Sequence, residues 1–114
     1  MSDDRYRPRS YTTEPAAFGK AATIAWTSVP HSGEARLLAA QVQHHCAVAI
    51  TREAKARYAT LKRYARVAGV DYQRLTKILR GEAVMRLEDM ANARLHLGDA
   101  IPFGQPFTDP RHRR

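Results

Sequence analysis

TLKRYARVAGVDYQRLTKILRG, residues 60–81, decides the fold of this chain, because it predicts two short helices joined by a tight corner. The first helix has a small apolar face, formed by Tyr64, Ala65 and Ala68. Gly69 can adopt the left-handed backbone conformation that ends a helix. Asp71 then begins a second helix, and its carboxylate is expected to accept a hydrogen bond from the amide of Gln73 or Arg74.

The second helix of this stretch has one buried face and one exposed face. Its buried stripe is formed by Leu75, Ile78 and Leu79. Its outward side chains are Tyr72, Gln73, Thr76, Lys77 and Arg80. Amides, hydroxyls and cations are the side chains that proteins use to bind DNA bases and phosphates. The exposed face of this helix is therefore the main functional signal in the sequence.

Composition limits the chain to one small domain and favours a polyanionic partner. Its 114 residues are 44% hydrophobic, which is enough for one modest core. Nineteen Lys and Arg against eleven Asp and Glu give a formal net charge of +8, which suits nucleic acid or an acidic membrane surface. No apolar run approaches the roughly 20 residues of a membrane span, and we expect neither a secretion signal nor a membrane partner. The single cysteine, Cys46, excludes an internal disulfide and fits a reducing compartment, so we expect a cytoplasmic protein.

Three parts are predicted along the chain. Residues 1–20 are expected to form a flexible basic arm, because they contain arginines and prolines and little to bury. Residues 21–98 form a helical domain that contains the motif at 60–81. Residues 99–114 form a proline-rich basic tail that cannot continue a helix. Together these parts predict a mostly α protein built as a small helical bundle.

Outside the motif, several alternatives stay open. Residues 21–29 form either a short strand or an apolar segment packed on the helices, and a strand there could pair with residues 100–103. Glu34–Tyr58 contains no Gly or Pro and forms either one long helix or two, with Thr51 capping the second. Leu87–Leu97 is expected to be a further helix. The residues predicted to share its apolar face are Leu87, Met90, Ala91 and Leu97.

Extended to residue 98, the motif resembles the helix-turn-helix of the phage-repressor and Cro family, also called the xenobiotic-response-element type. The resemblance covers about residues 54–98 and is carried by Tyr64, Ala65, Gly69, Val70, Leu75, Ile78, Gly81, Leu97 and Gly98. Ala65 is small where the two helices would cross closely, and Gly69 lacks a Cβ where the backbone turns. The resemblance implies a sequence-specific regulator of transcription that binds double-stranded DNA, with repression by operator occupancy as the default. It also implies a homodimer, whose two recognition helices would lie about 34 Å apart to match one turn of DNA.

In this family the second helix of the motif enters the major groove, which assigns roles to its exposed residues. The predicted base-reading residues are Tyr72, Gln73 and Lys77. Glutamine can form two hydrogen bonds with adenine, and lysine can reach the acceptors of guanine. The predicted phosphate-binding residues, which position the protein without reading sequence, are Lys62, Arg63, Arg74, Thr76 and Arg80.

Some positions depart from the family pattern. Leu79 stands where an acidic residue is frequent and Ala54 stands where its arginine partner is expected, so packing would replace a buried ion pair. Met85 and Arg86 replace the Pro-Ser pair that commonly opens the following helix, which leaves that helix without a good cap. Leu61 stands where a polar phosphate-binding residue is frequent.

The residues do not indicate catalysis or metal binding. His44, His45 and Cys46 are adjacent on a predicted helix and point about 100° apart, so they cannot converge on one ion. Glu88 and Asp89 also diverge on successive helix positions. The sequence contains neither a nucleophile with a recognisable partner pattern nor a Gly-rich phosphate loop. We therefore expect no enzymatic activity, no metal and no cofactor.

Two further kinds of binding stay open beside DNA regulation. The same fold could be a protein-interaction module, as in antitoxins or adaptors, with the apolar end segments as its contact. Trp26, Phe103 and Phe107 would either cover the core or form a dimer contact. A charge of +8 also suits a nonspecific nucleic-acid binder. The arginines within residues 5–9 and 111–114 could follow a DNA backbone or a minor groove.

Overall fold

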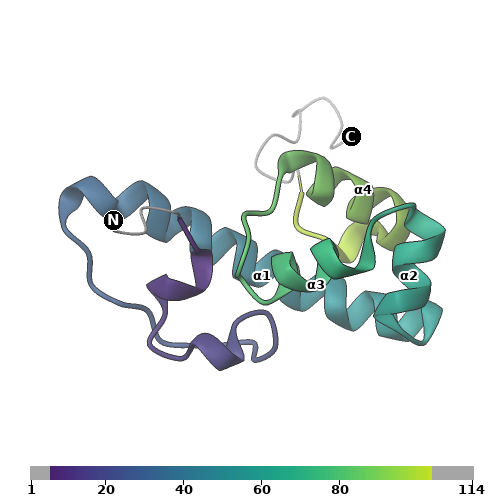
Figure 1. The fold of residues 1–114 in the computed structure, drawn as a ribbon, viewed down its shortest axis with the longest axis horizontal. Coiled ribbons are helices and arrows are strands. Elements are labelled where there is room, and N and C mark those ends of the chain that lie inside the picture. Colours follow the sequence, from purple (N-terminus) through teal and green to yellow (C-terminus); the bar gives the residue numbers. More distant parts are fainter. Residues whose placement is uncertain (1–5, 104–114) are drawn as a thin grey trace, which may run out of the picture.

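Residues 6–103 are described by the computed structural model, and most of them lie in four α-helices (Figure 1). The helices are α1 (Glu34–Tyr58), α2 (Leu61–Ala68), α3 (Tyr72–Leu79) and α4 (Leu87–Leu97). The short 3₁₀ turns are η1 (Pro8–Tyr11), η2 (Pro15–Ala17), η3 (His31–Gly33) and η4 (Gly98–Ala100). Residues 6–103 contain no β-strand, so the prediction of a mostly α small helical bundle is confirmed.

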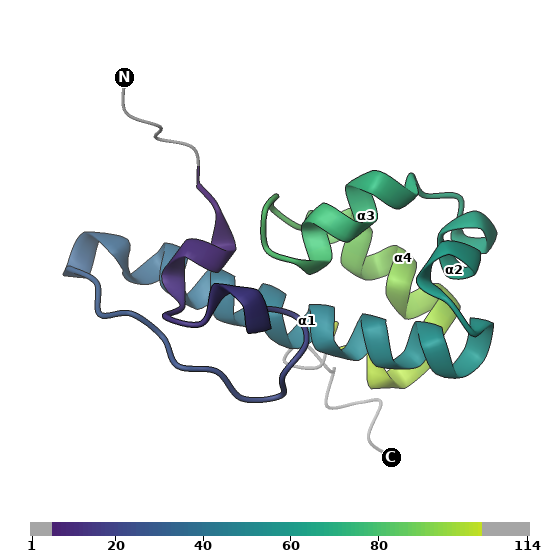
Figure 2. The same ribbon diagram turned by 60° about the horizontal axis from the view of Figure 1, so that its bottom comes forward.

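α1 is a single helix and supports the rest of the fold. Figure 2 shows α2, α3 and α4 packed over its C-terminal half. The N-terminal segment, residues 6–20, lies along its other half. The first of the two alternatives for Glu34–Tyr58 is therefore correct, and Thr51 lies inside the helix rather than at a cap. The buried face of α1 consists mainly of small residues, which lets its neighbours pack closely. Its members are Ala40, Gln43, His44, Cys46, Ala47, Ala49, Ile50 and Ala54.

The corner between α2 and α3 forms as local sequence signals predict. The hydroxyl of Thr60 accepts a hydrogen bond from the Arg63 amide at 3.0 Å, which caps the start of α2. Gly69 ends α2 in the left-handed conformation, with a φ of 75°. The Asp71 carboxylate then accepts from the Arg74 amide at 2.8 Å, which confirms the predicted cap of α3.

α4 begins and packs differently from the expectation. The Asp89 carboxylate accepts a hydrogen bond from the Arg86 amide at 2.8 Å, so this helix does have a cap, supplied from its own first turn. Leu87 was expected on the buried face, but its side chain is 72% exposed. Ala93 and Leu97 are the residues of α4 that are fully buried. Leu87 is the first residue of the helix, and its side chain lies about 120° around the helix from that of Ala93, six residues later.

The N-terminal residues pack against the helices, which differs from the flexible arm predicted for 1–20. Pro8 and Phe18 are fully buried, and the amide of Gly19 donates a hydrogen bond to Nδ1 of His44 on α1 at 2.9 Å. One aromatic anchor and one buried hydrogen bond thus fix a segment whose composition suggested mobility. Residues 1–5 of the predicted arm lie outside the described residues.

The predicted pairing between residues 21–29 and 100–103 is wrong. The isolated bridge within residues 6–103 joins Thr12 to Trp26, while Ile101 is fully buried in the helical core. Residues 21–29 therefore form the packed apolar segment that was the alternative to a strand, with Ile24 only 6% exposed. Trp26 makes edge-on contacts with the rings of Phe18 and His44 and so covers part of the N-terminal segment. Phe103 packs against the core. Phe107 and the rest of the tail beyond residue 103 lie outside the described residues.

Candidate nucleic-acid interface

α3 presents the three predicted base-reading residues on its exposed side. Tyr72 is 39% exposed, and Gln73 and Lys77 are also exposed. With about 100° of rotation per residue, the outward side chains of α3 from Tyr72 to Arg80 cover an arc of about 140°. Leu75, Ile78 and Leu79 fill the opposite side and are buried. The fold thus brings the predicted base readers together on one uninterrupted face.

Lys62 and Arg63 lie at the start of α2, where they were expected to bind phosphate. Both side chains are exposed, and the backbone of this first helical turn is held by the Thr60 cap. Cations at such a position can meet the phosphate strand beside a helix lying in the groove. Leu61, beside them, is half-buried and packs against the core, so its apolar character has a structural reason.

Arg74, which was predicted to bind phosphate, forms an ion pair within the protein. Its guanidinium forms two parallel hydrogen bonds with Asp89, Nη1 to Oδ1 at 2.8 Å and Nη2 to Oδ2 at 2.9 Å. Burial alone would raise the pKa of Asp89, but the hydrogen bonds from Arg74 and from the Arg86 amide outweigh burial and lower that pKa. The hydrogen bond to Asp89 also raises the pKa of Arg74. Arg74 therefore joins α3 to the first turn of α4.

Thr76 is also used within the protein. Its hydroxyl donates to the carbonyl of Gln73, one turn back in the same helix, at 2.8 Å, and its side chain is half-buried. A phosphate oxygen needs a donor, and this arrangement directs the Thr76 hydrogen into the helix. The structure therefore leaves Lys62, Arg63 and Arg80 as the predicted phosphate-binding residues that face solvent.

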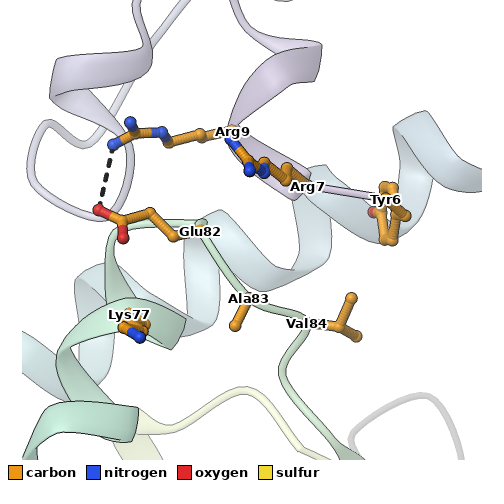
Figure 3. Close-up of a pocket in the computed structure, with 7 residues that line it drawn as sticks. All are labelled: Tyr6, Arg7, Arg9, Lys77, Glu82, Ala83 and Val84. Atoms are coloured by element: carbon orange, nitrogen blue, oxygen red, sulfur yellow. Dashed lines mark hydrogen bonds and ion pairs between the residues drawn. The ribbon is translucent and has the colours of Figure 1, made fainter. Parts of the chain in front are cut away.

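Arg80 lies just after α3, and its side chain forms an ion pair with Glu82. Its Nε is 3.1 Å from Oε2 of Glu82, and Nη1 of Arg9 is 3.4 Å from the same oxygen. Figure 3 shows the Arg9–Glu82 pair beside Lys77 at this end of α3. Arg80 keeps a side-chain exposure of 50%, so the ion pair leaves it open to a further anion.

Gln43 was not predicted from the sequence, although it fixes the end of α3. It is 5% exposed, and its Nε2 donates to the carbonyls of Ile78 at 2.8 Å and Ala83 at 2.9 Å. Its Oε1 accepts from the amide of Met85 at 2.8 Å. The sequence does contain a signal for this role, because Gln43 is an amide on the mainly apolar face of α1. A polar side chain buried on such a face requires hydrogen-bond partners.

Comparison of the chain with protein-family models, with curated protein sequences and with solved structures gives no match. The features that bear on function are therefore the geometry of α2 and α3 and the charge around them. Residues 6–103 contain no helix that is long and apolar enough to cross a membrane.

Proposed function

We propose that this protein is a sequence-specific regulator of transcription that binds double-stranded DNA, and that it represses by occupying an operator. One observation carries the proposal: α3 exposes Tyr72, Gln73 and Lys77 on a single face while its other face is buried in the core. The major groove is about 12 Å wide, which matches the roughly 10–12 Å diameter of a helix with its side chains.

The chemistry of this face supports base reading. Gln73 can donate to and accept from adenine, and Lys77 can donate to guanine. Lys62, Arg63 and Arg80 would hold the flanking phosphates, and the formal net charge of +8 would draw the protein toward a polyanion. Thr76 is not part of this contact set, because its hydroxyl donates inside the protein. Arg74 uses two of its five N–H donors on Asp89, so the phosphate contact predicted for it stays a prediction.

Selection of bound sequences from random DNA duplexes tests the proposal. The wild-type protein should enrich one motif, and Gln73→Ala and Lys77→Ala should lose sequence preference with unchanged thermal unfolding, because both side chains are exposed. Arg94→Gln is the matched control, since Arg94 lies on α4 and pairs with Asp99 at 2.8 Å. Wild-type protein that enriches no motif would refute the proposed function.

A homodimer is part of the proposal, because two recognition helices one DNA turn apart would read a palindrome. Its contact would lie on the N-terminal half of α1, where Leu38 is 61% exposed and Val42 is 45% exposed. Leu38 and Val42 border an apolar groove that continues past Val84 to Met90. The exposed apolar side chains and the apolar groove therefore lie side by side. Such a surface can be self-complementary about a two-fold axis. Sedimentation equilibrium of the wild type and of Leu38→Asp should show a dimer and a monomer, respectively.

The same exposed apolar residues favour a second function, that of a protein-interaction module. Salt dependence distinguishes the two functions. A protein that neutralises several DNA phosphates should lose orders of magnitude in affinity between roughly 50 and 200 mM salt, whereas an apolar protein contact should change little. Stronger binding to single-stranded RNA than to duplex DNA would instead indicate a nonspecific or RNA-directed role.

A further inference from the structure

The N-terminal segment and the end of α3 enclose a cleft that lies beside the base-reading face. The cleft is open, has a volume of about 430 Å³, and includes Tyr6, Arg7, Arg9, Lys77 and Glu82 in its lining (Figure 3). Lys77 belongs both to this cleft and to the exposed arc of α3. A DNA duplex seated on α3 would therefore bring its backbone close to the cleft.

The folded core fixes the position of the N-terminal arginines. The amide of Arg9 donates to the carbonyl of Gly81 at 3.0 Å, directly after the recognition helix. Gly81 has a φ of 76°, and a Cβ added there would lie 2.8 Å from both the Arg9 Cβ and the Phe18 ring. This close approach means that Arg9 is held against the end of α3 by backbone contacts.

The outer end of the same segment is attached to α1. The hydroxyl of Tyr6 donates to the carbonyl of Arg36 at 2.8 Å, and the Arg36 guanidinium lies over the Tyr6 ring, 5.5 Å from its centre. Arg7 lies between two anchored residues, so its backbone too is placed by the fold. An ordered cation loses less conformational entropy on binding than one carried by a mobile arm.

The charges around the cleft suit an anion. The cations in or beside it are Arg7, Arg9, Lys77 and Arg80, and they surround one carboxylate, Glu82. Arg9 and Arg80 each use one nitrogen on the same Glu82 oxygen, which brings the two guanidinium groups together. A guanidinium has five N–H donors, so each can also donate to an anion.

We propose that this cleft binds a phosphodiester group of the DNA backbone, which extends the contact beyond the helix-turn-helix. The inference rests on the proposed function. The occupant is a nucleic-acid phosphate rather than a free anion, because the cleft is open and shares Lys77 with the base-reading face. Arg7 and Arg9 donate to the phosphate oxygens, while Lys77 joins this contact to α3.

The test is the salt dependence of affinity for a duplex that carries the selected motif. Each phosphate contact contributes about 0.9 to the slope of log affinity against log salt. Arg9→Gln and Arg7→Gln should each reduce the slope by about 1 and leave the selected motif unchanged, because phosphate contacts do not read sequence. Arg94→Gln should keep the wild-type slope. Thermal unfolding of each variant checks the fold, and Arg7→Gln serves as the second variant because its side chain is exposed.

Three results would overturn the inference in distinguishable ways. If the wild type selects a motif but both cleft variants keep its salt slope, the cleft does not bind backbone phosphate and the proposed function stands. If inorganic phosphate shifts the NMR signals of the cleft residues while the duplex slope stays unchanged in the variants, the cleft is a small-anion site. If the wild type binds no duplex, the proposed function fails and the inference fails with it.

Discussion

Replacing Gln43 by methionine should weaken the attachment of the end of α3 to α1. Methionine has a similar length and is apolar, so the change removes hydrogen bonds while largely filling the same space. In the wild type, the Gln43 amide makes three hydrogen bonds of 2.8–2.9 Å across the α3–α4 connection. Their partners are the carbonyls of Ile78 and Ala83 and the amide of Met85.

The three lost hydrogen bonds differ in their cost. The carbonyl of Ile78 also accepts from the Gly81 amide at 3.1 Å, so it keeps a partner in the variant. Each buried group left without a partner costs about 1–3 kcal/mol, so Ala83 and Met85 together predict a loss of about 2–6 kcal/mol. Small domains have free energies of unfolding of about 5–15 kcal/mol, so the variant should fold but with a large fraction of its stability removed.

Urea unfolding followed by circular dichroism measures this loss. Gln41→Met is the matched control, because Gln41 lies on the same helix two residues earlier and is only half-buried. The control should change the free energy of unfolding by less than about 0.5 kcal/mol, as surface substitutions usually do. A loss below about 1 kcal/mol in Gln43→Met would refute the reasoning, because the amide would then contribute little beyond its volume.

Three further predictions concern the close packing at Gly81, the protonation of His44 and the burial of Cys46. Gly81→Ala should lower the free energy of unfolding more than Gly69→Ala in urea titrations, because both glycines have a φ near 75° but only a Cβ at Gly81 would meet atoms at 2.8 Å. Equal losses would contradict the close docking of residues 8–19. Stability should fall as the pH drops below 6.5, the ordinary histidine value, because burial and then the neighbouring His45 lower the pKa of His44, so the unfolded chain takes up the proton first. Chemical denaturation across pH 5–7 should show a weaker dependence in His44→Gln, and an identical dependence would contradict this origin. Cys46 should resist alkylation by iodoacetamide in the folded protein at pH 8 and react in urea, because burial raises the pKa of its thiol to about 12. Rapid native-state labelling, measured by mass spectrometry, would show that the core opens readily.

The α2–α3 corner could be predicted because each of its signals is local. Thr60 and Asp71 cap helices that begin one residue later, and Gly69 takes its left-handed conformation at the residue after α2. Such caps depend on residues within one helical turn, which a sequence displays directly. The exposed positions of Gln73 and Lys77 then follow from helical periodicity.

The docking of the N-terminal segment could not be predicted in the same way. Residues 6–20 have no helical or strand periodicity, and their burial depends on contacts such as Gly19 with His44, twenty-five positions apart. Their local composition, rich in arginine and proline, is typical of a mobile arm. The sequence signals for this docking were two glycines, Gly19 and Gly81. In the structure both have a positive φ, and another segment approaches each of them closely.

The prediction for Arg74 illustrates a third situation, in which a usable signal was present but incomplete. Taking Tyr72 as the origin, Arg74 lies at about 200° on the helix, outside the 140° arc of the other exposed residues. Helical geometry therefore places it at the edge of the exposed face of α3. Its partner Asp89 lies fifteen positions later, and only the packing of α4 brings the two together.

Taken with the core, these contacts explain how an eight-residue helix can present its side chains in a fixed direction. A helix as short as α3 is marginal by itself, since isolated helices shorter than about 12–15 residues are barely stable in water. Its start is capped by Asp71, its middle is joined to α4 by the Arg74–Asp89 pair, and its end is held by Gln43. Ala54 and Leu79 are both buried, so apolar packing occupies the positions where the resemblance implies an ion pair. Burial alone allows a helix to rotate or slide, whereas hydrogen bonds at its start, middle and end restrict both motions. The polar contacts around α3 therefore determine where its exposed residues point, and the apolar stripe supplies most of the energy that keeps it folded.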